Sequence, residues 1–169
     1  IRAAFRDICA DVEFACVAVS PMYVPGSSLL YDHVHFNLQG NYRAATTIFG
    51  AAAQRLHAPS GTVPPLDEVT RALGFTAFDE RNALQQQRDF LRQPIFARQR
   101  GHAARMQRMQ TAWDEAAAAV VSQGFDRLAH SYHTALAQRP ADHGLWLRLG
   151  SLCREFGAFA DGTAALQRA

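Results

Sequence analysis

Two side chains near the beginning of the sequence, Asp32 and His35, have the types and the spacing needed for acid/base chemistry. A histidine acts as a general base when its second ring nitrogen is held by a hydrogen-bond acceptor. A carboxylate three residues away on a tight turn can be that acceptor. The spacing is therefore compatible with a carboxylate–imidazole pair.

Two other interpretations of these residues are open from the sequence. Asp32 can be an ordinary turn residue, and His35 can cap a helix or satisfy a buried polar group. A metal site would use Asp32, His33 and His35, but alternate histidines without a further ligand cluster are a poor zinc signature. We therefore expect no metal and no cofactor. The other histidines are scattered among polar residues and are expected at the surface: His102, His130, His133 and His143.

The segments on either side of the pair must position it. An apolar run from Val12 to Val19 predicts a buried strand, and the prolines between Pro21 and Ser28 predict a loop. Asn37 is of the residue type that caps helix N-termini. Apolar residues then recur at steps of three and four, which predicts an amphipathic helix: Leu38, Tyr42, Ala45, Phe49, Ala52 and Leu56.

Residues 57–65 are rich in proline, glycine and serine, and we interpret them as a linker between two domains. The pattern beyond this linker is helical. A first helix is predicted from Leu66 to Leu73, where Gly74 ends it.

Thr76 and Asp79 resemble a capping box and predict a helix that reaches about Arg92 before Pro94 breaks it. A third helix follows, in which large and small apolar side chains at alternating steps of three and four form a packing seam: Met106, Met109, Trp113, Ala116 and Val120.

The last part of the sequence repeats with a period near 34 residues, which is the length of a tetratricopeptide (TPR) repeat. Phe125 and Phe159 are separated by this interval. The segment from Trp146 to Cys153 resembles the opening W-x2-L-G-x2-Y of a TPR, and Pro140 precedes it as the proline that ends a repeat. We expect paired helices that approach closely at Gly150, with Trp146 and Phe159 filling the space between them.

The peptide from Leu30 to Tyr42, with its Asp-x-x-His followed by Gly-Asn-Tyr, resembles the last sequence block of SGNH (GDSL-type) hydrolases. This resemblance implies that Asp32 orients the imidazole and that His35 is the general base for a serine. The whole stretch resembles large bacterial proteins in which an SGNH-like domain precedes TPR repeats.

The resemblance implies a mainly α fold, in which TPR-like helical hairpins follow the C-terminal remnant (short strand, loop, helix) of an α/β SGNH-like domain. We assign 1–56 to the remnant, 57–65 to the linker, 66–108 to a helical connector and 109–169 to truncated TPR-like repeats.

The nucleophile expected from this resemblance is missing. Ser20, Ser27 and Ser28 have no Gly-Asp-Ser setting, so the sequence is expected to be a fragment that is inactive alone. The parent would cleave ester or acetyl-type bonds and would bind a protein or peptide through its TPR-like face. The alternative is a non-enzymatic TPR scaffold with a degenerate hydrolase-like domain.

Composition restricts the partners. A formal net charge of +2 gives no reason to expect nucleic acid, and the arginines between Arg88 and Arg108 are interpreted as a solvated helix face. No apolar run is long enough for a membrane span. Three cysteines without a CxxC pair favour a reducing compartment such as the cytoplasm.

Overall fold

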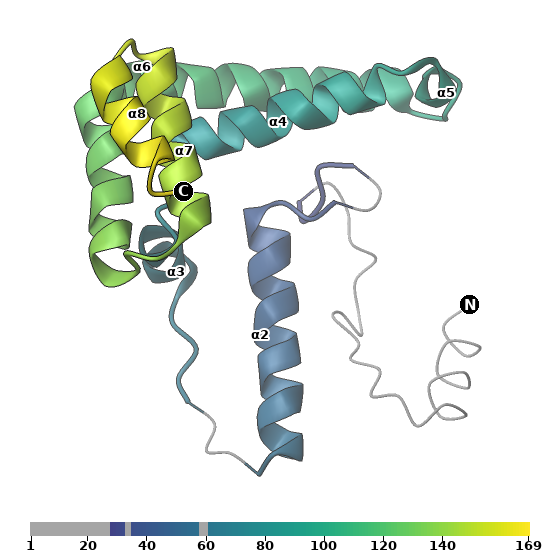
Figure 1. The fold of residues 1–169 in the computed structure, drawn as a ribbon. Coiled ribbons are helices and arrows are strands. Elements are labelled where there is room, and N and C mark those ends of the chain that lie inside the picture. Colours follow the sequence, from purple (N-terminus) through teal and green to yellow (C-terminus); the bar gives the residue numbers. More distant parts are fainter. Residues whose placement is uncertain (1–27, 33–34, 58–60) are drawn as a thin grey trace. The chain divides into compact units, whose positions relative to one another are not determined.

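The computed structural model describes residues 28–32, 35–57 and 61–169, which fold almost entirely into helices and turns (Figure 1). The prediction of a mainly α chain is confirmed. Within the described ranges the only β pairing is an isolated antiparallel bridge between Leu30 and Phe36. The strand predicted at 12–19 lies outside the described residues. The chain divides into two compact units, Ile1–Val63 and Pro64–Ala169, and this division falls inside the predicted linker.

The first unit contains one described helix, α2 (Leu38–Arg55), which begins where the sequence predicted. Asn37 is its N-cap, and the Asn37 side chain accepts a hydrogen bond from the Gly40 N–H at 2.9 Å. The second half of the apolar stripe of α2 is exposed, since Phe49 is 49% exposed and Leu56 is 76% exposed.

The second unit opens with the short helix α3 (Leu66–Ala72), which ends before Gly74 as predicted. Gly74 has a φ of 58°, a left-handed conformation that favours glycine. The Phe75 N–H then reaches back to the Thr70 carbonyl at 3.0 Å, so that α3 closes with a Schellman motif.

The next two long helices form a hairpin, with one short helix between them. Helix α4 (Ala77–Leu91) opens with the predicted capping box of Thr76 and Asp79, and Pro94 occupies the first turn of the short helix α5 (Pro94–Ala97). Helix α6 (His102–Gln138) returns along α4 (Figure 1). At Gly124, with φ 68° and ψ 172°, the helical conformation is interrupted and α6 changes direction.

The predicted seam on α6 is largely confirmed, because Met109, Ala116 and Val120 are buried. Met109 packs with Leu91 and Phe96 in a small cluster at the closed end of the hairpin. No helix in the described part of the chain is both long and apolar enough to cross a bilayer.

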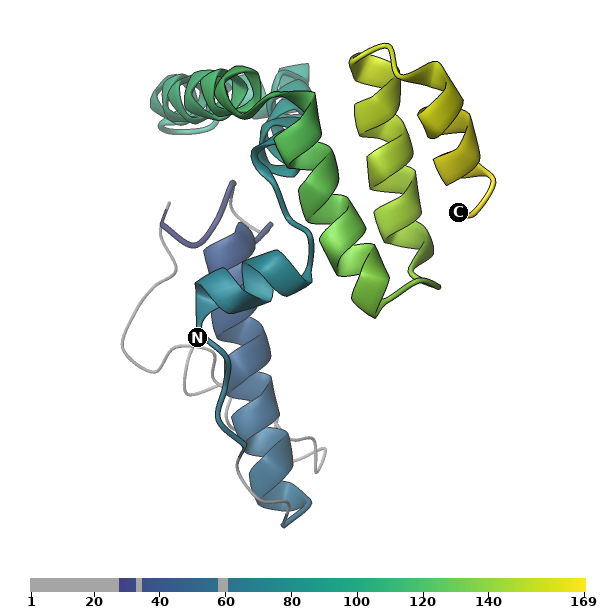
Figure 2. The same ribbon diagram turned by 90° about the vertical axis from the view of Figure 1, so that its left-hand side faces the viewer.

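Helix α7 (His143–Glu155) lies beside the second half of α6, and helix α8 (Phe159–Leu166) packs against α7 (Figure 2). Gly157, with a φ of 77°, makes the turn between them. The prediction that Phe159 fills the space between these helices is wrong, because its side chain is 68% exposed. Phe159 is the first residue of α8, and the two helices approach closely at Gly150, which faces Leu166, and at Gly162, which faces Cys153.

The main core of the second unit lies where α4, α6 and α7 meet. Its centre is formed by large, completely buried side chains: Leu128, Tyr132, Leu145 and Leu152. Burial of each of these leucines stabilises the fold by about 1.5–3 kcal/mol.

A polar network crosses this core at the hydroxyl of Tyr132. The hydroxyl lies 3.2 Å from Thr76 Oγ1, and the backbone N–H and hydroxyl of Thr76 both donate to Asp79 Oδ2, at 2.8 and 3.0 Å. Arg148 lies 3.5 Å from the same Asp79 oxygen. Burial of the phenol and the nearby Asp79 carboxylate raise the pKa of Tyr132 far above its ordinary value, so Tyr132 stays neutral in this network.

Arginines from α7 and from the end of α6 satisfy the last carbonyls of α3. Arg148 donates to the Leu73 carbonyl at 2.8 Å, and Arg139 donates to the Ala72 carbonyl at 2.6 Å. Positive charge at a helix C-terminus also interacts favourably with the helix dipole. These contacts join the end of α3 to residues that lie 67 and 75 positions further along the chain.

We predict that Asp79→Ala lowers the free energy of unfolding of the second unit by about 1–3 kcal/mol, because it removes a capping box and leaves buried donors without an acceptor. Urea unfolding followed by tryptophan fluorescence measures this loss, since both tryptophans lie in the second unit. The control is Asp67→Ala, because Asp67 is 77% exposed and forms only a surface ion pair with Arg71. Its effect should stay within about 0.5 kcal/mol; equal losses for the two variants would contradict the role of the network.

Candidate functional site

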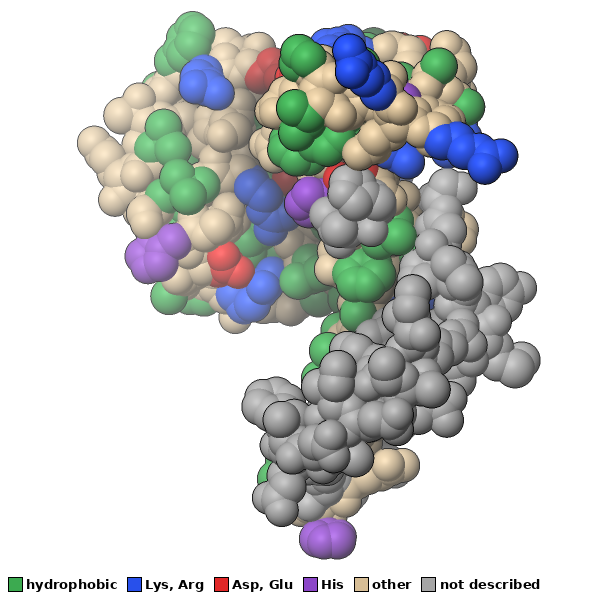
Figure 3. All heavy atoms as spheres, turned by 90° about the vertical axis from the view of Figure 1, so that its right-hand side faces the viewer, with side chains coloured by type: hydrophobic (Ala, Val, Ile, Leu, Met, Phe, Trp, Pro, Cys, Tyr) green, Lys and Arg blue, Asp and Glu red, His purple; other side chains and the backbone are tan. Residues whose placement is uncertain are grey.

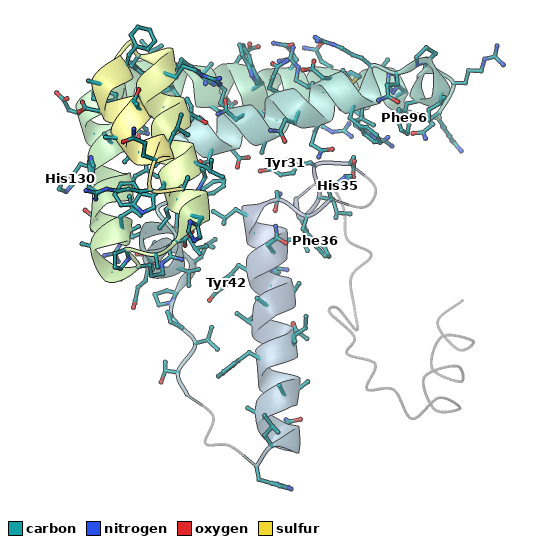
Figure 4. All side chains as sticks on the ribbon, viewed as in Figure 1. Tyr31, His35, Phe36, Tyr42, Phe96 and His130 are labelled. Carbon is teal, nitrogen blue, oxygen red and sulfur yellow. The ribbon has the colours of Figure 1, made fainter. Side chains whose placement is uncertain are left out.

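The two residues that the sequence singled out, Asp32 and His35, are in contact in the loop before α2. The two carboxylate oxygens of Asp32 have separate roles: Oδ2 lies 2.7 Å from Nδ1 of the His35 ring, and Oδ1 accepts the His35 backbone N–H at 2.8 Å. Figure 4 shows His35 with Tyr31 and Phe36 on this loop, next to the first turn of α2. The carboxylate therefore fixes both the backbone and the ring of His35.

Hydrogen bonds between its two flanks close the loop. The Tyr31 N–H donates to the His35 carbonyl at 2.9 Å, and the Asn37 N–H donates to the Leu29 carbonyl at 3.0 Å. These bonds lie on either side of the bridge between Leu30 and Phe36. His33, one member of the metal site considered from the sequence, lies outside the described residues.

The first turn of α2 packs closely against this loop at Gly40. A Cβ atom added at Gly40 would lie 2.1 Å from the Leu29 carbonyl oxygen and 2.7 Å from the ring of Phe36. A backbone oxygen cannot move aside without opening the loop, so only glycine fits at this position. The sequence showed a Gly-Asn-Tyr after the pair but did not reveal this contact.

Burial differs sharply between the two partners. The Asp32 side chain has no solvent exposure, whereas the His35 side chain is 50% exposed. A desolvated carboxylate interacts more strongly with its neighbour than one in water does. The hydrogen bond at Nδ1 selects the tautomer with its proton on that nitrogen, which directs the lone pair to Nε2 on the other side of the ring. This is the arrangement of a general base with an orienting carboxylate.

No group of three or more potential metal-ligating side chains occurs among the residues that the structure describes. His130, which the sequence placed at the surface, projects outward from α6 (Figure 4). His102 is partly exposed at the start of α6.

The arginines between Arg88 and Arg108 do not all lie on a solvated face. On the face shown in Figure 3, basic side chains are separated by apolar and acidic ones. Arg88 is only 6% exposed, so the prediction of a solvated face is wrong at this position. Its guanidinium lies 5.0 Å from the centre of the Trp113 ring and donates to Gln110, which joins α4 to α6.

A groove of about 360 Å³ lies between α4 and α7 in the second unit. Its walls combine apolar side chains with polar ones, and Leu147 on α7 is 52% exposed. The lining includes Phe75, Phe78, Asn82, Gln86, Leu147 and Ser151.

Comparison of the chain with protein-family models, with curated proteins and with solved structures found no match. The functional argument therefore depends on the geometry of the chain itself.

We predict that Gly40→Ala opens the loop that holds Asp32 and His35. Amide hydrogen exchange should then accelerate at the His35 and Asn37 N–H groups, because the new methyl group displaces the Leu29 carbonyl. Gly50→Ala is the matched control on the same helix, since its added Cβ would meet nothing within 4 Å apart from the adjacent backbone of α2 itself. It should leave the loop unchanged and stabilise α2 by roughly 0.5–1 kcal/mol. Unchanged exchange at His35 in Gly40→Ala would contradict the close packing.

Proposed function

We propose that Asp32 and His35 are the acid/base pair of an SGNH-hydrolase-like domain that acts on ester or acetyl-type bonds. The observation that carries this proposal is the double contact of the buried Asp32 carboxylate with the backbone and ring of His35. An ordinary turn aspartate needs only the backbone contact. The additional contact at Nδ1 supports a chemical role for the ring.

In the proposed reaction, Nε2 of His35 removes the proton from a serine hydroxyl as the serine oxygen attacks the carbonyl carbon of the substrate. Asp32 stabilises the imidazolium that forms. His35 then gives the proton to the departing alkoxide, and an acyl-enzyme remains. Attack by water, with His35 again taking and returning the proton, releases the acid and restores the serine.

We place the serine in a longer protein, outside residues 1–169. Ser20, Ser27 and Ser28 have no Gly-Asp-Ser setting, and the chain alone is therefore proposed to be inactive. The exposed Phe49 and Leu56 on α2 support this assignment, because a helix that closes an α/β domain needs other elements to cover its apolar face.

The close pairing of α7 with α8 supports the proposal that TPR-like repeats follow this domain. A Cβ added at Gly150 would lie 2.8 Å from the Leu166 side chain, and one added at Gly162 would lie 3.1 Å from Cys153 Cβ. Gly162 and Leu166 have the spacing of the small and large residues in the second helix of a TPR, A-x3-F. Glycine at positions 150 and 162 allows the two helices to approach closely.

Labelling of the longer protein by a fluorophosphonate probe tests the catalytic proposal. His35→Ala should slow labelling by about 10²- to 10⁴-fold, the usual contribution of a general base. Asp32→Asn should also slow it, whereas His130→Ala, on the outer surface of α6, should not. The 169-residue chain should take up no probe. Labelling that is independent of His35, or labelling of the 169-residue chain itself, would contradict the proposal.

The groove between α4 and α7 favours protein binding as a second function, alone or beside catalysis. An exposed leucine between polar side chains that can bond to a backbone is suited to an extended peptide. This function corresponds to the non-enzymatic scaffold, in which the helical part carries the activity.

Peptides selected by display against the 169-residue chain should lose about tenfold or more in affinity for the Leu147→Glu variant, because a charge replaces an apolar side chain that the bound peptide would cover. Val121→Glu is the control, since Val121 is 82% exposed on α6 and does not line the groove. Equal losses for both variants, or selected peptides that bind Leu147→Glu normally, would exclude the groove as the binding site.

A further inference from the structure

We propose that Asn37 is a positioning residue for His35, and this inference rests on the proposed acid/base function. Asn37 connects three parts of the structure. Its backbone N–H donates to the Leu29 carbonyl at 3.0 Å, its Nδ2 donates to the Ser28 carbonyl at 3.0 Å, and its Oδ1 accepts the Gly40 N–H at 2.9 Å. Asn37 therefore joins the segment before the loop, at Ser28 and Leu29, to the first turn of α2 at Gly40.

The residue type is informative because helix capping alone does not require asparagine. Aspartate, serine or threonine at this position would also accept the Gly40 N–H. Only the amide of asparagine combines such an acceptor with a separate N–H donor that extends to the Ser28 carbonyl. That donor is used for Ser28, which lies nine residues earlier and belongs to the other side of the loop. The second hydrogen bond therefore serves the loop rather than the helix.

These bonds hold the backbone of His35 in place. Its carbonyl accepts from Tyr31, its N–H donates to Asp32, and the adjacent flank of the loop is held by Asn37. Misplacement of a catalytic group by about 1 Å can reduce a rate about 10²-fold. Asn37 does not contact the reacting nitrogen and acts on it only through the backbone, so its effect is on the orientation of the ring.

Asn41 provides a natural comparison within the same turn of α2. Its Nδ2 also donates to the loop, but to the Phe36 carbonyl at 3.3 Å, with no capping bond beside it. Loss of this single, longer and exposed bond should have little effect on the loop.

The test is nitrogen-15 NMR of the His35 ring in the 169-residue chain, with the signals assigned through His35→Gln. In the unaltered chain the Nδ1–H tautomer should dominate. Asn37→Asp keeps the acceptor for Gly40 and removes the donor to Ser28, so the ratio of Nδ1–H to Nε2–H should fall about three- to tenfold, the usual effect of one hydrogen bond. Asn37→Ser should give the same fall, and circular dichroism should show that α2 remains helical in both variants.

Each outcome has a definite meaning. A dominant Nε2–H tautomer in the unaltered chain overturns the acid/base pair itself, and with it this inference. A dominant Nδ1–H tautomer that is unchanged by Asn37→Asp and Asn37→Ser overturns only the role of Asn37. An equal fall in Asn41→Ala also overturns it, since any loss of loop contact would then have the same effect.

Discussion

The turn between Leu29 and Asn37 must close for Asp32 and His35 to meet, and the acid/base chemistry proposed for the first unit depends on this closure. Neither residue is held by a regular element, since the described part of the loop contains only one isolated bridge. Order comes instead from backbone bonds across the loop and from the close approach of α2 at Gly40. Within this frame a buried carboxylate can align an imidazole that is half exposed, so that one partner is desolvated and the other remains accessible.

The second unit is ordered by a different means, a leucine-rich core crossed by one polar network. Tyr132 is buried completely, and its hydroxyl has a partner because Thr76 and Asp79 open α4 at that point. Arg148 joins the same network and also satisfies a carbonyl at the end of α3. Buried polar groups whose hydrogen bonds are all satisfied select one packing arrangement of the helices. The groove beside Leu147 is a product of this arrangement.

Local signals in the sequence predicted the helices well, because the capping box of α4 and the glycine that ends α3 act over a few residues. Contacts between residues far apart in the sequence were not predictable. Arg81 pairs with Glu155, 74 positions later, and Arg88 on α4 lies against the ring of Trp113 on α6. The exposed position of Phe159 was missed because periodicity does not give the direction of a side chain at a helix start. For the site, the family resemblance together with the spacing predicted the contact of Asp32 with His35. The support from Asn37 and Gly40 depends on the approach of segments in three dimensions, and the hydrolase and TPR assignments are proposals.

The most direct measurement of the central claim is the reactivity of His35 toward diethyl pyrocarbonate, followed by mass spectrometry on the 169-residue chain at neutral pH. A carboxylate that fixes the ring proton on Nδ1 makes Nε2 the reactive nitrogen and increases its nucleophilicity. The account predicts that His35 is modified at Nε2 faster than the exposed His130 and His143, and that Asp32→Asn removes this advantage. Modification of His35 at the same rate as these surface histidines, or a rate unaffected by Asp32→Asn, would contradict the claim that Asp32 and His35 form an acid/base pair.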